Sequence, residues 1–169
     1  TPIGISGTQT AVAQTVTSPG ALLFSGTSVG FVLHNDQTGS MGNDSSIDNA
    51  QIIDVTPQLD KAFSPASIQL GQVSRLTMTI TNTTDLLRKQ GWSFTDNLPA
   101  GLVVEGNAST TCPGTTGQAA AGGSIVTVSN GDLAQGAAFC EVSLDVRPTA
   151  TGSFTNGPSN LSLIGLNQP

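Results

Sequence analysis

The sequence predicts an all-β protein built as a β-sandwich. Of its 169 residues, 20 are Gly and 9 are Pro, Tyr is absent, and only 9% are charged, whereas soluble domains usually carry about a quarter of charged residues. A chain rich in Ser, Thr, Gly and Pro that lacks Lys/Glu-rich runs favours short strands joined by turns over helices. Apolar and polar residues also alternate along its second half, which is typical of strands with one face in a core.

The alternation is clearest in two stretches, 73–82 and 140–148. Leu76, Met78 and Ile80 alternate with Arg and Thr in the first, and Val142, Leu144 and Val146 alternate with Glu, Ser and Asp in the second. The stretch 58–72 has the pattern of an extended strand, and turn signals separate further predicted strands at 66–70, 91–96, 101–106, 124–129, 152–156 and 160–165. No helix is predicted beyond a single turn within 83–91. This spacing of short strands is typical of a sandwich.

The chain changes character near Pro57. Before it lie short apolar runs at 10–16, 21–26 and 29–35, then a polar stretch at 35–49 and one more predicted strand at 50–55. Sandwich modules of about 100 residues fit the remainder. We therefore expect a partial β module over 1–55 and a sandwich over 56–169.

Charge and cysteine content limit the setting of the protein. A net charge of −6 with five Lys and Arg argues against nucleic acid and anionic lipid as partners, because both bind basic surfaces. No apolar run is long enough for membrane insertion, and the first residues do not resemble a signal peptide, so we expect a mature or excised chain. Cys112 and Cys140 have no neighbouring ligands for zinc, so a disulfide is favoured over free thiols. This predicts an oxidising, extracellular location.

Several segments carry a resemblance to a known family. They are "LDKAFSPASIQLGQVSRLTMTITNTT", "WSFTDNLPAGLVV" with its specific core "FTDNLPAGL", the two cysteines, and "TGSFTNGPSN". Over about 56–166 the chain resembles the immunoglobulin-like repeat of unknown function found in tandem in large surface proteins of bacteria, actinobacterial or other Gram-positive. Residues 34–55 are similar to the closing strands of a lectin-like jelly-roll module. The resemblance implies an immunoglobulin-like β-sandwich in a cell-wall-linked or secreted stalk or adhesin, and it implies no ligand.

Three predicted strands each place one polar residue beside an aromatic on the same face, because residues i and i+2 of a strand share a face. The pairs are Lys61 with Phe63, Asp96 with Phe94, and Asn156 with Phe154. If the aromatic rings point inward, an amine, a carboxylic acid and a carboxamide do so too.

Burial disfavours charge on an amine and on a carboxylic acid alike. A neutral Lys61 could attack the carboxamide carbon of Asn156 while protonated Asp96 hydrogen-bonds the amide oxygen and relays protons. The product would be an intramolecular isopeptide bond, with release of ammonia. This set resembles the first-strand lysine, central acid and last-strand asparagine of pilin and collagen-adhesin domains of Gram-positive bacteria. It reacts once, so we expect no enzyme.

Other interpretations of these residues remain open at this point. The Lys61 amine could extend to water over Phe63, and Asp96 could belong to a turn before Pro99. Asn156 and Gly157 together form a strong turn signal. Within the crosslink hypothesis, Asn160 is a second candidate acceptor, and Asp60 or Glu141 could replace Asp96 as the acid.

The polar stretch before Pro57 offers oxygen ligands for a cation. Asp36, Asp44 and Asp48, interspersed with Asn and Gly, could hold calcium, although the spacing is not that of an EF-hand. The same residue types are common in solvated turns. No other cofactor is expected. His34, the single histidine, has no Ser or Cys partner at a telling spacing, which argues against a catalytic triad.

Three functions are compatible with these observations. The favoured one is a structural stalk or spacer module of an extracellular adhesin or fibre, attached to the cell surface or cell wall, whose parent protein binds a ligand on a host or neighbouring cell. The second is a filament subunit that self-assembles by strand addition. The third is a calcium-dependent carbohydrate- or protein-binding module.

Overall fold

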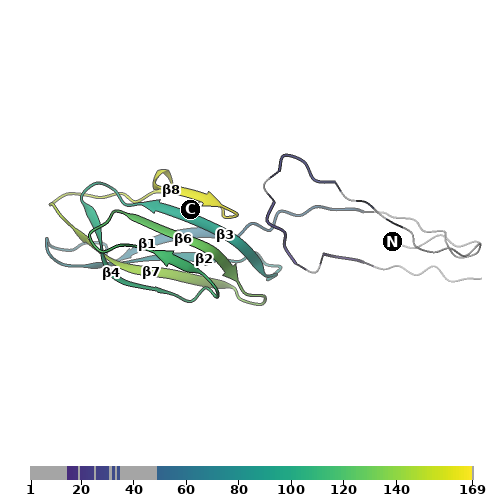
Figure 1. Ribbon diagram of the computed structural model, residues 1–169, viewed down its shortest axis with the longest axis horizontal. Coiled ribbons are helices and arrows are strands. Elements are labelled where there is room, and N and C mark those ends of the chain that lie inside the picture. The colour runs from purple at the N-terminus through teal and green to yellow at the C-terminus, as the bar shows by residue number, and fades with distance from the viewer. Residues whose placement is uncertain are drawn as a thin grey trace, which may run out of the picture. The chain divides into compact units, whose positions relative to one another are not determined.

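The computed structural model describes residues 15–18, 20–24, 26–30, 32, 34 and 49–168. The chain divides into two compact units, and the second, Gly20–Phe24 with Val55–Pro169, contains every strand that the structure describes. That unit consists of two layers of β-sheet (Figure 1).

Each layer is a four-stranded antiparallel sheet. The first has the order β1 (Gln58–Ser64), β2 (Ser74–Thr81), β7 (Phe139–Pro148), β4 (Leu102–Thr110). The second has the order β5 (Thr116–Gln118), β6 (Ile125–Leu133), β3 (Lys89–Asn97), β8 (Leu161–Ile164). A 3-10 turn, η1 (Pro158–Asn160), precedes β8. The predicted all-β sandwich is confirmed.

The alternating stretches form the two central strands of the first sheet, β2 and β7. Their registers place Leu76 opposite Leu144 and Met78 opposite Val142, and all four side chains are buried. The polar residues between them face outward. Period-two patterning was therefore a sufficient signal for these two strands.

The second sheet presents its largest side chain, Trp92, to the core. The Trp92 and Phe94 rings are stacked with centroids 6.4 Å apart, and both residues are almost fully buried. Trp92 pairs with Gly131 of β6 at an irregularity in the ladder. A Cβ at Gly131 would lie 2.0 Å from the indole ring, so only glycine leaves room for it there.

Two predicted strands are wrong. Residues 66–70 form part of the β1–β2 connection, which ends in a turn where Gln72 N–H donates to the Gln69 carbonyl and Gly71 has a φ of +86°. Residues 152–156 belong to no strand and join no ladder. Both have strand-like composition, yet neither finds a neighbouring strand to pair with. The short edge strand β5 carries no alternating pattern and was not predicted.

The first unit is described only in part. Among the described residues before Gln58 no strand is assigned, so the strand predicted at 50–55 is wrong as well. The division into modules at 1–55 and 56–169 stays a prediction. No helix in the described part of the chain has the length and apolar character to cross a membrane.

We expect Gly131→Ala to destabilise the sandwich by about 1–3 kcal/mol, because the added methyl group collides with the buried Trp92 ring. Chemical denaturation followed by tryptophan fluorescence measures the effect. Gly117→Ala is the matched control, since a Cβ at Gly117 on the edge strand β5 meets nothing within 4 Å. Equal stabilities of the two variants would contradict this account of the packing.

Candidate functional site

The structure brings Lys61, Asp96 and Asn156 together inside the second unit. They come from β1, from β3, and from the segment between β7 and η1. In β1, Leu59 is fully buried and Phe63 packs against the core. Lys61 lies between them on the same face, opposite the buried Met78. Only 4% of its side chain is exposed, so the expectation that its amine reaches water is wrong.

Asp96 is the most deeply buried member, with no exposed surface. It is part of β3 and does not form a turn before Pro99. Its ladder partners are Val126 of β6 and Leu161 of β8, both buried and apolar. A carboxyl group between such neighbours depends on hydrogen-bond partners within the protein.

The three side chains close a ring of hydrogen bonds. Lys61 Nζ donates to Asn156 Oδ1 at 2.9 Å and to Asp96 Oδ1 at 3.1 Å. Asn156 Nδ2 donates to the other carboxyl oxygen, Asp96 Oδ2, at 2.7 Å. One carboxyl oxygen therefore contacts the amine and the other contacts the amide nitrogen. The sequence-based scheme had Asp96 bonded to the amide oxygen instead, a position that the structure gives to Lys61.

Two opposing influences act on the Lys61 amine. Burial lowers the pKa of Lys61, and the charge of Asp96 and its hydrogen bond raise it; burial is the larger influence, so the pKa lies below its ordinary value. The amine thus gives up its proton more readily than an exposed lysine. Asp96 Oδ1, already hydrogen-bonded to Nζ, is positioned to receive that proton.

The backbone after Asn156 is also held in place. Gly157 O accepts from Lys61 Nζ at 3.2 Å and from Asn160 N at 3.1 Å, and Gly157 N–H donates to Asn160 Oδ1 at 3.1 Å. Asn160 Nδ2 donates to Asn97 O at 2.6 Å, which ties η1 to β3. Asn160 is therefore hydrogen-bonded to the backbone of Gly157 and of Asn97, and it does not contact the Lys61 amine. Sequence patterns do not report these backbone contacts, although the Asn156-Gly157 turn signal lies at the same residues.

The other candidate acids lie elsewhere. Asp60 is exposed and occupies the opposite face of β1 from Lys61. Glu141 lies on the outer face of β7, 3.5 Å from the Thr79 hydroxyl. Among the described carboxyl groups, Asp96 is the one that contacts the Lys61 amine.

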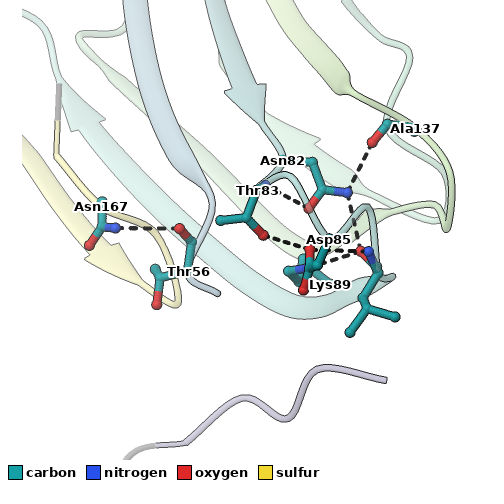
Figure 2. A network of polar contacts seen from close by, with 8 residues as sticks. Thr56, Asn82, Thr83, Asp85, Lys89, Ala137 and Asn167 are labelled. Atoms are coloured by element: carbon teal, nitrogen blue, oxygen red, sulfur yellow. Dashed lines mark hydrogen bonds and ion pairs between the residues drawn. The ribbon is translucent and has the colours of Figure 1, made fainter. Parts of the chain in front are cut away.

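The second lysine provides an internal comparison (Figure 2). The Lys89 side chain is 5% exposed, and its Nζ donates to Asp85 Oδ1 at 2.8 Å and to Leu87 O at 3.1 Å. The nearby Asn82 carboxamide is bonded to the backbone of Thr83, Leu87 and Ala137. Lys89 is thus a buried, ion-paired lysine whose hydrogen bonds include no carboxamide.

Asp85, the partner of Lys89, is a partly exposed carboxylate. Burial raises its pKa, but the hydrogen bonds from Lys89, Thr83 and the Leu87 N–H together outweigh burial, and the pKa of Asp85 lies below its ordinary value. Asp85 therefore stays ionised and stabilises the β2–β3 connection.

The predicted disulfide is confirmed. Cys112 and Cys140 are bonded, with 28 residues of sequence separation, and both are buried. The bond links the loop after β4 to β7. In the chain-entropy model, closing a loop of this length stabilises a fold by about 3–4 kcal/mol.

The calcium candidates Asp36, Asp44 and Asp48 lie outside the described residues. Within the described part of the chain, no group of three or more His, Cys, Asp and Glu residues could hold a metal ion. Calcium binding stays a prediction.

Fold and site together define a disulfide-bonded β-sandwich domain with a buried Lys-Asp-Asn cluster. A family model described as "Domain of unknown function (DUF7933)" matches residues 57–165, well over half of the chain. The chain belongs to this family. No curated protein matches it. The resemblance to a domain family of unknown function is therefore confirmed, over nearly the expected residues.

If Lys61 attacks Asn156, the attacking amine must be neutral, so we expect the rate to rise with pH. Because burial lowers the pKa of Lys61, this rise should lie below the range in which exposed lysines titrate, about 10.4.

The measurement starts from chain recovered unfolded from inclusion bodies, refolded over a pH series and followed by intact mass. A rate that begins to rise only in the range in which exposed lysines titrate would contradict the lowered pKa of Lys61.

Proposed function

We propose that this domain is a mechanically stable spacer of an extracellular surface protein, and that it crosslinks itself through an isopeptide bond between Lys61 and Asn156. The observation that supports this is the ring of hydrogen bonds in which Asp96 contacts both the amine and the amide nitrogen. Such contacts position a nucleophile, its acceptor and a proton carrier side by side.

In this reaction Asp96 first takes one proton from the Lys61 ammonium group. The neutral Nζ attacks Cγ of Asn156, so that the Nζ–Cγ bond forms and the Cγ–Nδ2 bond breaks. Asp96 gives its proton to the leaving nitrogen, which departs as ammonia, and takes the second Nζ proton in exchange. The reaction happens once per chain, so the protein is not an enzyme.

The position of the crosslink explains its mechanical value. Lys61 lies in the first strand of the sandwich and Asn156 shortly before the last, at a sequence separation of 95. A force applied to the two ends of the domain would pass through the new bond and bypass both sheets. Hydrogen-bonded strands between the two residues would carry no load.

The setting follows from the disulfide and from the resemblance to bacterial surface repeats. A buried disulfide is typical of proteins in oxidising compartments, and a spacer at a cell surface is pulled when its parent protein binds. We therefore place the domain in the stalk of a bacterial adhesin or fibre, as one of several immunoglobulin-like repeats. The ligand is bound elsewhere in the parent protein.

We expect the natural chain to be lighter than its sequence mass by one ammonia, after allowance for the disulfide. Asp96→Asn removes the proton carrier at constant size and should restore the full mass. Lys89→Met, which alters the other buried lysine, should leave the loss unchanged. Intact mass spectrometry reads all three.

Trypsin locates the bond, because it does not cut after an acylated lysine. After reduction of the disulfide, the peptide ending at Arg75 should remain joined to the peptide beginning at Gln90. Separate peptides, or a full mass for the natural chain, would refute the crosslink.

Single-molecule pulling should separate the crosslinked and uncrosslinked states. With the disulfide intact, 28 of the 95 residues are withheld, which leaves 67 to extend, or roughly 220–240 Å of chain. Asp96→Asn should release this length when it unfolds. The natural chain should release none of it, and Lys89→Met should behave like the natural chain. Full extension of the natural chain would contradict the proposed function.

A further inference from the structure

The carboxamide of Asn156 has two nucleophiles beside it. One is the Lys61 amine. The other is the backbone nitrogen of Gly157, because an asparagine followed by glycine readily cyclises: the glycine nitrogen attacks Cγ, the Cγ–Nδ2 bond breaks, ammonia leaves and a succinimide forms. Water then opens the succinimide to aspartate or isoaspartate. This side reaction consumes the same carbon that the crosslink requires.

We infer that Asn160 is a positioning residue that suppresses succinimide formation and so reserves Asn156 for Lys61; this inference rests on the proposed function. Asn160 Oδ1 accepts the hydrogen bond from Gly157 N–H at 3.1 Å. Attack by this nitrogen requires loss of its proton, which breaks that bond and places negative charge against an oxygen lone pair. The nitrogen is thereby kept protonated and directed away from Cγ.

The hydrogen bond from Gly157 N–H to Asn160 Oδ1, here called the clamp, is strengthened by further contacts. The Gly157 carbonyl is held by Asn160 N and by Lys61 Nζ, so that both sides of this residue are fixed. Asn160 is itself anchored through Nδ2 to Asn97 O in β3. The Asn156 side chain, bonded to Lys61 and Asp96, is turned toward the amine. The structure thus presents Cγ to one nucleophile and restrains the other.

The two products are chemically distinguishable even though both lose one ammonia. A succinimide is cleaved by hydroxylamine between Asn156 and Gly157, and in water it becomes a deamidated chain with NH replaced by O. An isopeptide bond resists hydroxylamine and joins two tryptic peptides. Because Asn130-Gly131 is a second Asn-Gly pair, only the hydroxylamine fragment that ends at Asn156 reports the side reaction at this site.

The test uses the full chain carrying Asp96→Asn, in which Asn156 persists as a free carboxamide. In that background we compare no further change, Asn160→Ala and Asn160→Asp. Aspartate keeps an oxygen that accepts from Gly157 N–H but cannot donate to Asn97 O. The Asn160→Asp variant therefore distinguishes the effect of the first hydrogen bond from that of the second. Samples are held at mildly alkaline pH, and isoaspartate content and hydroxylamine fragments are measured over time.

We expect Asn160→Ala to deamidate Asn156 roughly three- to ten-fold faster, the rate factor that one lost hydrogen bond represents, and Asn160→Asp to stay near the background rate. Equal rates in all three chains would overturn the inference. So would equal acceleration by Ala and Asp, which would assign the effect to the lost anchor on Asn97.

The proposed function can fail separately. If Asp96→Asn still yields a hydroxylamine-resistant loss of ammonia, the role of Asp96 is wrong, and the same three chains are then compared in a Lys61→Met background, where no crosslink can form. If the natural chain never loses ammonia, the clamp is tested directly by Asn160→Ala and Asn160→Asp in the natural sequence.

Discussion

The structure depends on a buried ion pair, Lys61 with Asp96, placed between two sheets whose other contacts are mostly apolar. Taking both groups out of water costs several kcal/mol, which their attraction offsets only if every remaining polar atom is also bonded. Here Asn156 and the Gly157 carbonyl complete that set. Removing one member of such a pair typically costs roughly 3–5 kcal/mol. As a purely stabilising feature, the cluster therefore carries a large desolvation penalty. Conversion to a neutral covalent product would remove that penalty.

The contrast with the other basic residues supports this view. All five Lys and Arg side chains contact a carboxylate, but Arg88 and Arg147 are 51% and 40% exposed, and exposed pairs contribute little. Lys89 is as buried as Lys61, yet its partner Asp85 is 27% exposed and its hydrogen bonds go to no carboxamide. Burial, pairing and a reactive carbon coincide at Lys61.

Sequence patterns predicted the sandwich, the disulfide and the residues of the cluster, but not every one of these predictions rested on a correct structural reason. Alternation beside aromatic residues correctly turned Lys61 and Asp96 inward. Asn156 was placed by the same rule on a strand over 152–156 that does not form. It still faces the cluster because Phe154 packs against the core and Asn160 holds the following turn, contacts that no periodicity reports. Sequence patterns also did not predict that Gly131 makes room for the Trp92 ring. This contact arises at a ladder irregularity between β3 and β6, which are neighbours in the sheet but far apart in the sequence.

The order of events during folding links the crosslink to the clamp. The three reacting groups come from β1, β3 and the segment before η1, so they meet only when β1 has joined β2 and the second sheet has closed over it. If the proposed bond forms, it is therefore the last step of folding, and it forms only in chains that have packed correctly. Until then Asn156 and Gly157 lie side by side in a chain whose Lys61 amine is still distant. The hydrogen bond from Gly157 to Asn160 spans three residues and is local enough to form before the sheets meet. On the inference drawn above, it would restrain succinimide formation during that interval.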